Sequence, residues 1–230
     1  MKTILTTTLL AWTLLQDSFA QTDASPGVSN STVGTTVTNG ASLVPIVFIS
    51  ASAAGYGNTN YYFDGVGFST PDLHAFAAMQ GVMSNGVPAS AVTYVTNPAP
   101  HIGGGMNVAG YWSYGEDGGM GPDITYVNFT GNSRWYIMGT VDSYNGERGY
   151  EVIYQSYFLQ WFLPNAFGGA NYSSTPIGAV SHVTEPQLPG VENTGMYFGL
   201  WAAGKTFAIC AWGSRNTPYF QATGDPFVKR

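Results

Sequence analysis

The feature that most constrains the fold is a strand, a helix and a second strand that follow one another between residues 43 and 95. Residues 43–50 contain the apolar run 47–49, which is typical of a strand covered on both faces. The sequence Ser-Thr-Pro-Asp at 69–72 is a helix start signal, and Asn85-Gly86 ends that helix. Residues 92–95 indicate the next strand. This order predicts a βαβ unit, and therefore an α/β fold with a mostly parallel sheet.

The predicted helix has an apolar face that we assign to Leu73, Phe76, Ala77 and Val82. His74 lies on or near that face, so we expect it to be a partly buried residue and not a ligand. The loop that precedes the helix, rich in Gly, Tyr and Asn, contains no predicted strand.

The second half of the chain predicts further elements of both kinds. Residues 97–121 form a loop-rich interval with a short run at 108–114, and the glycines at 103–105 fit no phosphate-binding motif and favour a mobile surface loop. Runs at 124–129 and 134–141 are separated by the turn residues 130–133, which predicts a hairpin. A helix is expected within 150–162 and a strand at 177–183. The pattern of 195–214 fits both a hairpin and a buried helix.

The N-terminus carries a predicted export signal. Lys2 precedes the short apolar run 4–15, and Ser18-Phe19-Ala20 places small residues before Gln21. Residues 1–20 are therefore interpreted as a signal peptide, which predicts a secreted, periplasmic or cell-surface protein. Residues 21–40 are expected to form a flexible N-terminal arm, and 41–230 a single domain. No later run is long enough to span a membrane.

The chain is acidic and poor in charge, which restricts its partners. Only 9% of the residues are charged and the net charge is −6, so nucleic acid is excluded as a partner. Aromatic residues make up 15%, which suits contact with a peptide, a glycan or another copy, and the same composition is also common in secreted proteins that merely avoid charge. Cys210 is the only cysteine and lies in an apolar segment, so we expect an inert buried thiol.

Candidate site residues follow the apolar run that begins at Trp135. Side chains at the carboxyl end of a buried strand face the ligand crevice of a parallel sheet, which selects Asp142, Ser143 and Asn145. His182 and Glu185 lie at the end of a later strand. Ser143, His182 and Asp142 form a candidate set for a serine hydrolase, whereas the alternative role of the Ser143 hydroxyl is to cap the turn.

The order of several short motifs resembles the gingipain-type branch of the caspase-like cysteine peptidases. In that branch one strand ends in Gly-His-Gly, a later strand ends in Ala-Cys-x-Asn-Gly, and the domain closes on Gly-Asp-Pro. Asn145-Gly146 and Gly224-Asp225-Pro226 match this pattern. The nucleophile position falls on Ser143 and the histidine position on Tyr114, so both dyad positions differ. The pattern also resembles less-studied secreted bacterial proteins that share this frame without its dyad.

The resemblance implies a caspase-like three-layer α/β sandwich in which 195–214 is helical. It also implies a non-catalytic domain, a pseudoenzyme that binds a ligand around Tyr114, Ser143, Asn145 and Glu185 or acts as a surface or structural component. The alternative is a serine-type hydrolase that uses Ser143 with His182 as its base.

No cofactor and no metal are predicted. His101 has no spaced partner that would complete a zinc site, and the acidic residues at 116, 117 and 123 lack EF-hand spacing. The glycosylation sequons at Asn30, Asn128 and Asn171 matter only if the host glycosylates exported proteins.

Overall fold

The centre of the protein is a six-stranded, mostly parallel sheet. The computed structural model describes residues 32–39, 42–49, 57–66, 73–113, 126–149 and 156–230. The sheet has the order β10-β9-β8-β6-β3-β4, and only β10 runs antiparallel to its neighbour. Its strands are β3 (Asn60–Gly65), β4 (Val92–Thr96), β6 (Val108–Ser113), β8 (Ile137–Thr140), β9 (Gly178–His182) and β10 (Phe220–Gly224). The predicted α/β class with a mostly parallel sheet is confirmed.

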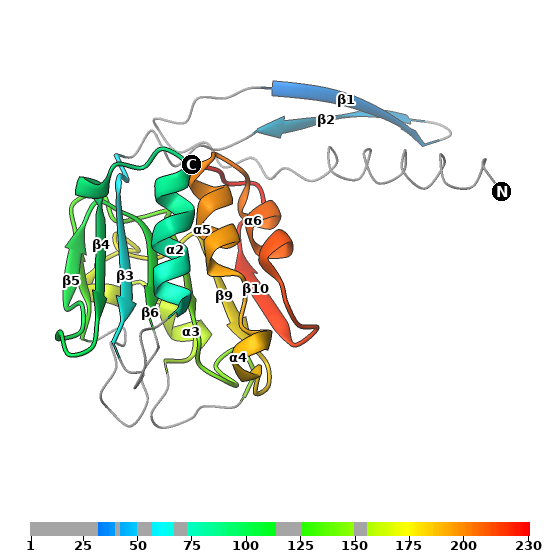
Figure 1. The fold of residues 1–230 in the computed structure, drawn as a ribbon. Helices are drawn as coiled ribbons and strands as arrows, with labels where there is room; N and C mark the ends of the chain where they lie inside the picture. Colours follow the sequence, from blue (N-terminus) through cyan, green and yellow to red (C-terminus); the bar gives the residue numbers. More distant parts are fainter. Residues whose placement is uncertain (1–31, 40–41, 50–56, 67–72, 114–125, 150–155) are drawn as a thin grey trace.

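Helices and small elements cover both faces of this sheet. Figure 1 shows α2 (Leu73–Ser84), α5 (Thr194–Ala202) and α6 (Phe207–Ser214) lying side by side over one face. The other face packs against α3 (Phe158–Trp161), the 3-10 turn η3 (Ala166–Gly168) and a two-stranded parallel sheet of β5 (Gly104–Met106) and β7 (Asn128–Thr130). Two further short helices are η2 (Ala89–Ala91) and α4 (Gln187–Gly190).

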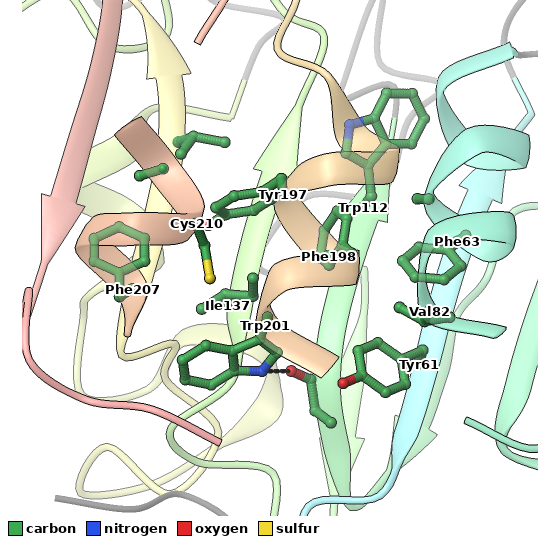
Figure 2. Packing of buried hydrophobic residues seen from close by; sticks show 14 of the residues in the cluster. Tyr61, Phe63, Val82, Trp112, Ile137, Tyr197, Phe198, Trp201, Phe207 and Cys210 are labelled. Carbon is green, nitrogen blue, oxygen red and sulfur yellow. Dashed lines mark hydrogen bonds between the residues drawn. The ribbon is translucent and has the colours of Figure 1, made fainter. Parts of the chain in front are cut away.

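Large aromatic side chains fill the core between the sheet and the three helices. Trp112, Tyr197 and Trp201 are completely buried in this layer, as Figure 2 shows. The indole nitrogen of Trp201 donates a hydrogen bond to the Ala109 carbonyl oxygen at 2.9 Å, which satisfies its polar atom in an apolar setting. Because no disulfide is available to a chain with one cysteine, this packing carries the stability of the domain.

The backbones of α2 and α5 pack unusually close together. A Cβ atom at Gly81 would lie 2.1 Å from the carbonyl oxygen of Gly195, far inside van der Waals contact. The small residues on the facing sides of both helices therefore set their separation.

The predicted helix after 69–72 is observed as α2, although its start signal lies outside the described residues. The predicted apolar face is partly wrong: Leu73 and Phe76 are exposed, and the buried positions are Ala75, Ala78 and Val82. The buried positions of α2 are small because only small side chains fit where its backbone approaches that of α5. His74 is partly buried, as expected, and its ring stacks on Trp112 with centroids 6.1 Å apart.

The hairpin predicted from 124–129 and 134–141 is wrong. β7 pairs with β5, whereas β8 lies in the central sheet between β6 and β9. The glycines at 104 and 105, assigned from sequence to a mobile loop, form β5. Glycine is required there because a Cβ at Gly104 would lie 2.5 Å from the carbonyl oxygen of Asn128.

The N-terminal segment also differs from its prediction. The strand expected at 43–50 exists as β2 (Ser42–Ile49), but it pairs with β1 (Thr32–Asn39) in a separate antiparallel hairpin and not with the central sheet. The strand β1 falls inside 21–40, which was expected to be a flexible arm. Its Thr and Val residues are typical of a strand, and Asn39-Gly40 is the signal for a hairpin turn.

The remaining predictions had mixed outcomes. The strands at 92–95 and 177–183 are confirmed as β4 and β9. The ambiguous stretch 195–214 is helical and forms α5 and α6. In the helix predicted within 150–162, the described part is limited to α3, and 150–155 lie outside the described residues. β3, a central strand, was missed. Among the described residues, no helix has the length and apolarity needed to cross a membrane.

Candidate functional site

The residues predicted as a site gather near the carboxyl ends of β8 and β9. Because β8 and β9 are parallel neighbours, the turn 142–146 and the last residue of β9, His182, lie at the same edge of the sheet. Tyr114 directly follows β6 in the sequence, but it lies outside the described residues.

Asn145 holds the turn after β8 against β9. It is buried, its Nδ2 donates to Thr140 Oγ1 at 2.6 Å, and its Oδ1 accepts from the backbone N–H of His182 at 3.3 Å. The neighbouring Gly146 N–H donates to the carbonyl oxygen of His182 at 2.9 Å. A Cβ at Gly146 would lie 2.6 Å from Ser181 Oγ, so Asn-Gly is a structural requirement of this turn. Both ends of the Asn145 amide are thus used in hydrogen bonds that stabilise this turn.

Ser143 and His182 do not form a catalytic pair in the structure. Ser143 is partly exposed, whereas His182 is completely buried, and neither ring nitrogen makes a hydrogen bond with a described residue. Glu185, predicted to line the same crevice, is exposed. A base must reach the hydroxyl it activates at about 2.6–3.2 Å, so His182 is not placed to activate Ser143.

The side chain that His182 meets is Glu192, which sequence reasoning missed. The two are both completely buried, and His182 Nε2 lies 3.7 Å from Glu192 Oε2. Glu192 precedes α5, and its carboxylate sits over Gly139, where a Cβ would lie only 2.7 Å from Oε1. The glycine in β8 therefore makes the space that the carboxylate occupies.

Burial decides the protonation state of this histidine. Desolvation lowers the pKa of His182 to about 4, the backbone of Asp142 opposes that shift in part, and the charge of His74 adds to it. An ion pair with Glu192 would raise the pKa instead, but a separation of 3.7 Å in a site without solvent does not outweigh the cost of a buried charge. The ring is therefore neutral near pH 7.

A second acid–histidine pair lies near the carboxyl end of β3. Asp64 is buried, and its Oδ2 lies 3.3 Å from His101 Nδ1 and accepts from the backbone N–H of Ile102 at 2.7 Å. Burial raises the pKa of the Asp64 carboxyl, and these donors oppose the shift. His101 was predicted to be without a spaced partner because Asp64 is 37 residues away in the sequence.

A hollow on the described surface lies elsewhere, between α6 and the edge strand β10. Its volume is about 740 Å³, which is within the range of ligand pockets. One wall is formed by α6 residues that include Ala208, Ile209 and Trp212, and the other by Phe220 and Ala222 of β10. Ile209 and Trp212 are 42% and 62% exposed. We call this feature the α6–β10 groove.

One cation lies at the end of this apolar groove. The Arg215 guanidinium stacks on the Trp212 ring, with its carbon 4.1 Å from the ring centroid, and Arg215 is the one charged residue among the described residues of the lining. No carboxylate of the described residues forms an ion pair with it. The sequence signal for the groove was a short helix, 207–214, that is apolar on both faces.

Comparisons of the chain with known proteins did not identify a related protein. Searches against protein families, curated proteins and solved structures found no match. The described residues also contain no group of three or more His, Cys, Asp or Glu side chains arranged to hold a metal ion.

Proposed function

We propose that the chain is an exported, non-catalytic caspase-like domain that works by binding, and that the α6–β10 groove is its binding surface. Export is supported by the sequence of residues 1–20. The groove replaces the crevice around Tyr114, Ser143 and Glu185 as the preferred binding surface. The observation that carries the proposal is an open apolar groove, together with a histidine that is completely buried and makes no hydrogen bond to Ser143.

The order of the motifs supports the caspase-like part of the proposal. In the structure, β6 ends at Ser113, directly before the expected histidine position, and the expected nucleophile position follows the adjacent parallel strand β8. The turn 142–146, α3, β9, the two helices α5 and α6, and the closing Gly-Asp-Pro at 224–226 then follow in the order that the resemblance requires.

The two dyad positions explain why such a domain lacks catalysis. A phenol has a pKa of about 10, so tyrosine at the histidine position is a poor base near neutral pH. A serine hydroxyl without a bonded base is a weak nucleophile. Neither residue needs to be reactive for the surrounding fold to be retained.

Labelling with a fluorophosphonate probe tests the absence of catalysis, because such probes react with activated serines. We expect the native protein to label no more than its Ser143→Ala variant at pH 7–8. Labelling that is lost in both Ser143→Ala and His182→Gln would establish the serine hydrolase alternative and overturn the proposal. A chymotrypsin-like serine protease in the same tube serves as the positive control.

A further inference from the structure

We propose that the α6–β10 groove takes the C-terminal segment of a peptide as an added antiparallel strand, with its terminal carboxylate on Arg215. The inference rests on the proposed binding function and names its ligand class. It arises from three features that meet at the groove: a strand edge and a cation that have no strand partner and no carboxylate partner among the described residues, and an apolar wall.

The free edge belongs to β10. This strand is the last in the sheet order and pairs with β9 alone, so one side of its backbone has no strand partner among the described residues. An edge strand presents a row of N–H and C=O groups that an extended peptide can pair with. Main-chain hydrogen bonds of this kind give affinity for a peptide that a lipid or a sugar does not share.

The apolar wall lies on one face of the same strand. Phe220, Ala222 and Gly224 line the groove, whereas Gln221 and Thr223 point to the opposite face, where their side chains hydrogen bond at 3.1 Å. A strand added beside β10 would continue this alternation. Every second side chain of the peptide would therefore enter the space beside Ile209 and Trp212.

The position of Arg215 sets the direction of the peptide. The backbone N–H of Ala208, at the start of α6, donates to Pro226, which follows β10, while residues 215–219 link the end of α6 to Phe220. The helix thus runs opposite to β10, and Arg215 lies near the Phe220 end. A peptide antiparallel to β10 would bring its carboxyl terminus to that end.

Charge complementarity favours a carboxylate at this point. The described residues of the lining include no acidic residue, and the guanidinium offers the paired donors that match a carboxylate. In a chain with a net charge of −6, a local cation next to an apolar surface selects an apolar ligand with one negative end.

The test selects random decapeptides with free C termini by display on the protein, with the Trp212→Ser variant as counter-selection. Enriched peptides should carry apolar residues at alternate positions up to the C terminus. Their synthetic fluorescein-labelled forms are then measured by fluorescence polarisation. We expect binding to weaken at least about tenfold in Trp212→Ser and to be unchanged in Tyr126→Ser, another exposed aromatic residue outside the groove.

Two peptide modifications separate the strand geometry from general hydrophobic binding. A C-terminal amide should weaken binding about tenfold to the native protein but not to Arg215→Gln, with Arg148→Gln as the matched control. Backbone N-methylation should weaken binding at the alternate positions that pair with β10 and not at the positions between them. The inference would be overturned if N-methylation had the same effect at every position of the peptide. It would also be overturned if the C-terminal amide bound as well as the free carboxylate.

The failures of the two proposals are distinguishable. If enriched peptides require Trp212 but bind equally well after amidation and N-methylation, the groove is a binding surface, and the proposal of an added strand is rejected. If the display yields no peptide that is enriched over the Trp212→Ser counter-selection, the inference is overturned. It is also overturned if light scattering shows a dimer that the Trp212→Ser substitution dissociates, because a second copy would then occupy the groove. Neither outcome alters the fluorophosphonate result on catalysis.

Discussion

Acidification should destabilise the protein through His182, and the size of the effect follows from its burial. The pKa of this histidine is about 4 in the folded protein and 6.5 in a free side chain, a difference of about 2.5 pKa units. At about 1.36 kcal/mol per unit, the difference corresponds to about 3 kcal/mol. The unfolded chain binds the proton more tightly, so the free energy of unfolding falls as the pH falls from 6.5 to 4. This contribution is constant above and below that window.

The measurement is urea unfolding followed by tryptophan fluorescence at a series of pH values from 7.5 to 4, for the native protein and for His182→Gln. The difference between the two curves isolates His182, because other titrating groups contribute to both proteins and any constant cost of the substitution only shifts the curve. The groups that face His182 are Glu192, Asp142 and His74. Burial lowers the pKa of His74 as well. Their coupling to His182 changes the shape of the curve more than its sign.

The opposite slope would refute the reasoning. If the native protein gained stability relative to His182→Gln on acidification through pH 6.5, His182 and Glu192 would form a true ion pair. A flat difference curve would mean that the ring is hydrated in the folded protein and keeps its ordinary pKa.

Three further predictions concern packing and reactivity. Gly81→Ala should lower the free energy of unfolding by about 3 kcal/mol or more, despite the better helix propensity of alanine, because the new Cβ meets a backbone oxygen of α5. The control Gln80→Ala, at an exposed position of the same helix, should change the free energy of unfolding by under about 0.5 kcal/mol. Gly139→Ala should cost about 2 kcal/mol by displacing the buried Glu192 carboxylate, measured by the same unfolding assay, and a neutral result would show that this carboxylate moves freely. Burial raises the pKa of Cys210 to about 12, so its thiol should resist iodoacetamide at pH 8 in the native protein and react fully in 8 M urea; rapid native labelling would contradict its burial.

Elements whose signals are local could be predicted from the sequence. The helix that became α2 had a start signal and an end signal within one short stretch, and β4 and β9 were short apolar runs between turn residues. The helical state of 195–214 was not local, since its alternation fits two structures. The resemblance in motif order resolved it.

Elements that depend on distant partners could not be predicted. β3 has the sequence Asn-Tyr-Tyr-Phe-Asp-Gly, which resembles a turn-rich loop, yet it is a strand because β4 and β6 pair with it on both sides. The run at 134–141 has hairpin signals before it, but its backbone pairs with β6 and β9 instead. Pairing between strands far apart in sequence leaves no trace in local composition.

The candidate site shows the same division. The position of the turn 142–146 at a strand end was predictable, because a buried apolar run stops there. The partner of His182 was not, since Glu192 comes from the segment before α5 and reaches the histidine over a glycine of β8. The groove was missed because Ile209 and Trp212 look like core residues in a sequence, and only the position of α6 beside the sheet edge exposes them.

The carboxyl ends of β8 and β9 and the outer side of β10 differ in the groups that they offer to a ligand. This difference favours β10 as the binding edge. At the described carboxyl ends of β8 and β9, the Asn145 amide holds the turn and the His182 ring is enclosed with Glu192, whereas Ser143 and Glu185 remain accessible. Along β10, the backbone edge has no strand partner among the described residues, and beside it lie exposed apolar side chains and a guanidinium that no described carboxylate pairs with. Binding requires groups whose hydrogen bonds and apolar area are not yet used within the fold. These differences favour binding along β10 over binding at the carboxyl ends of β8 and β9.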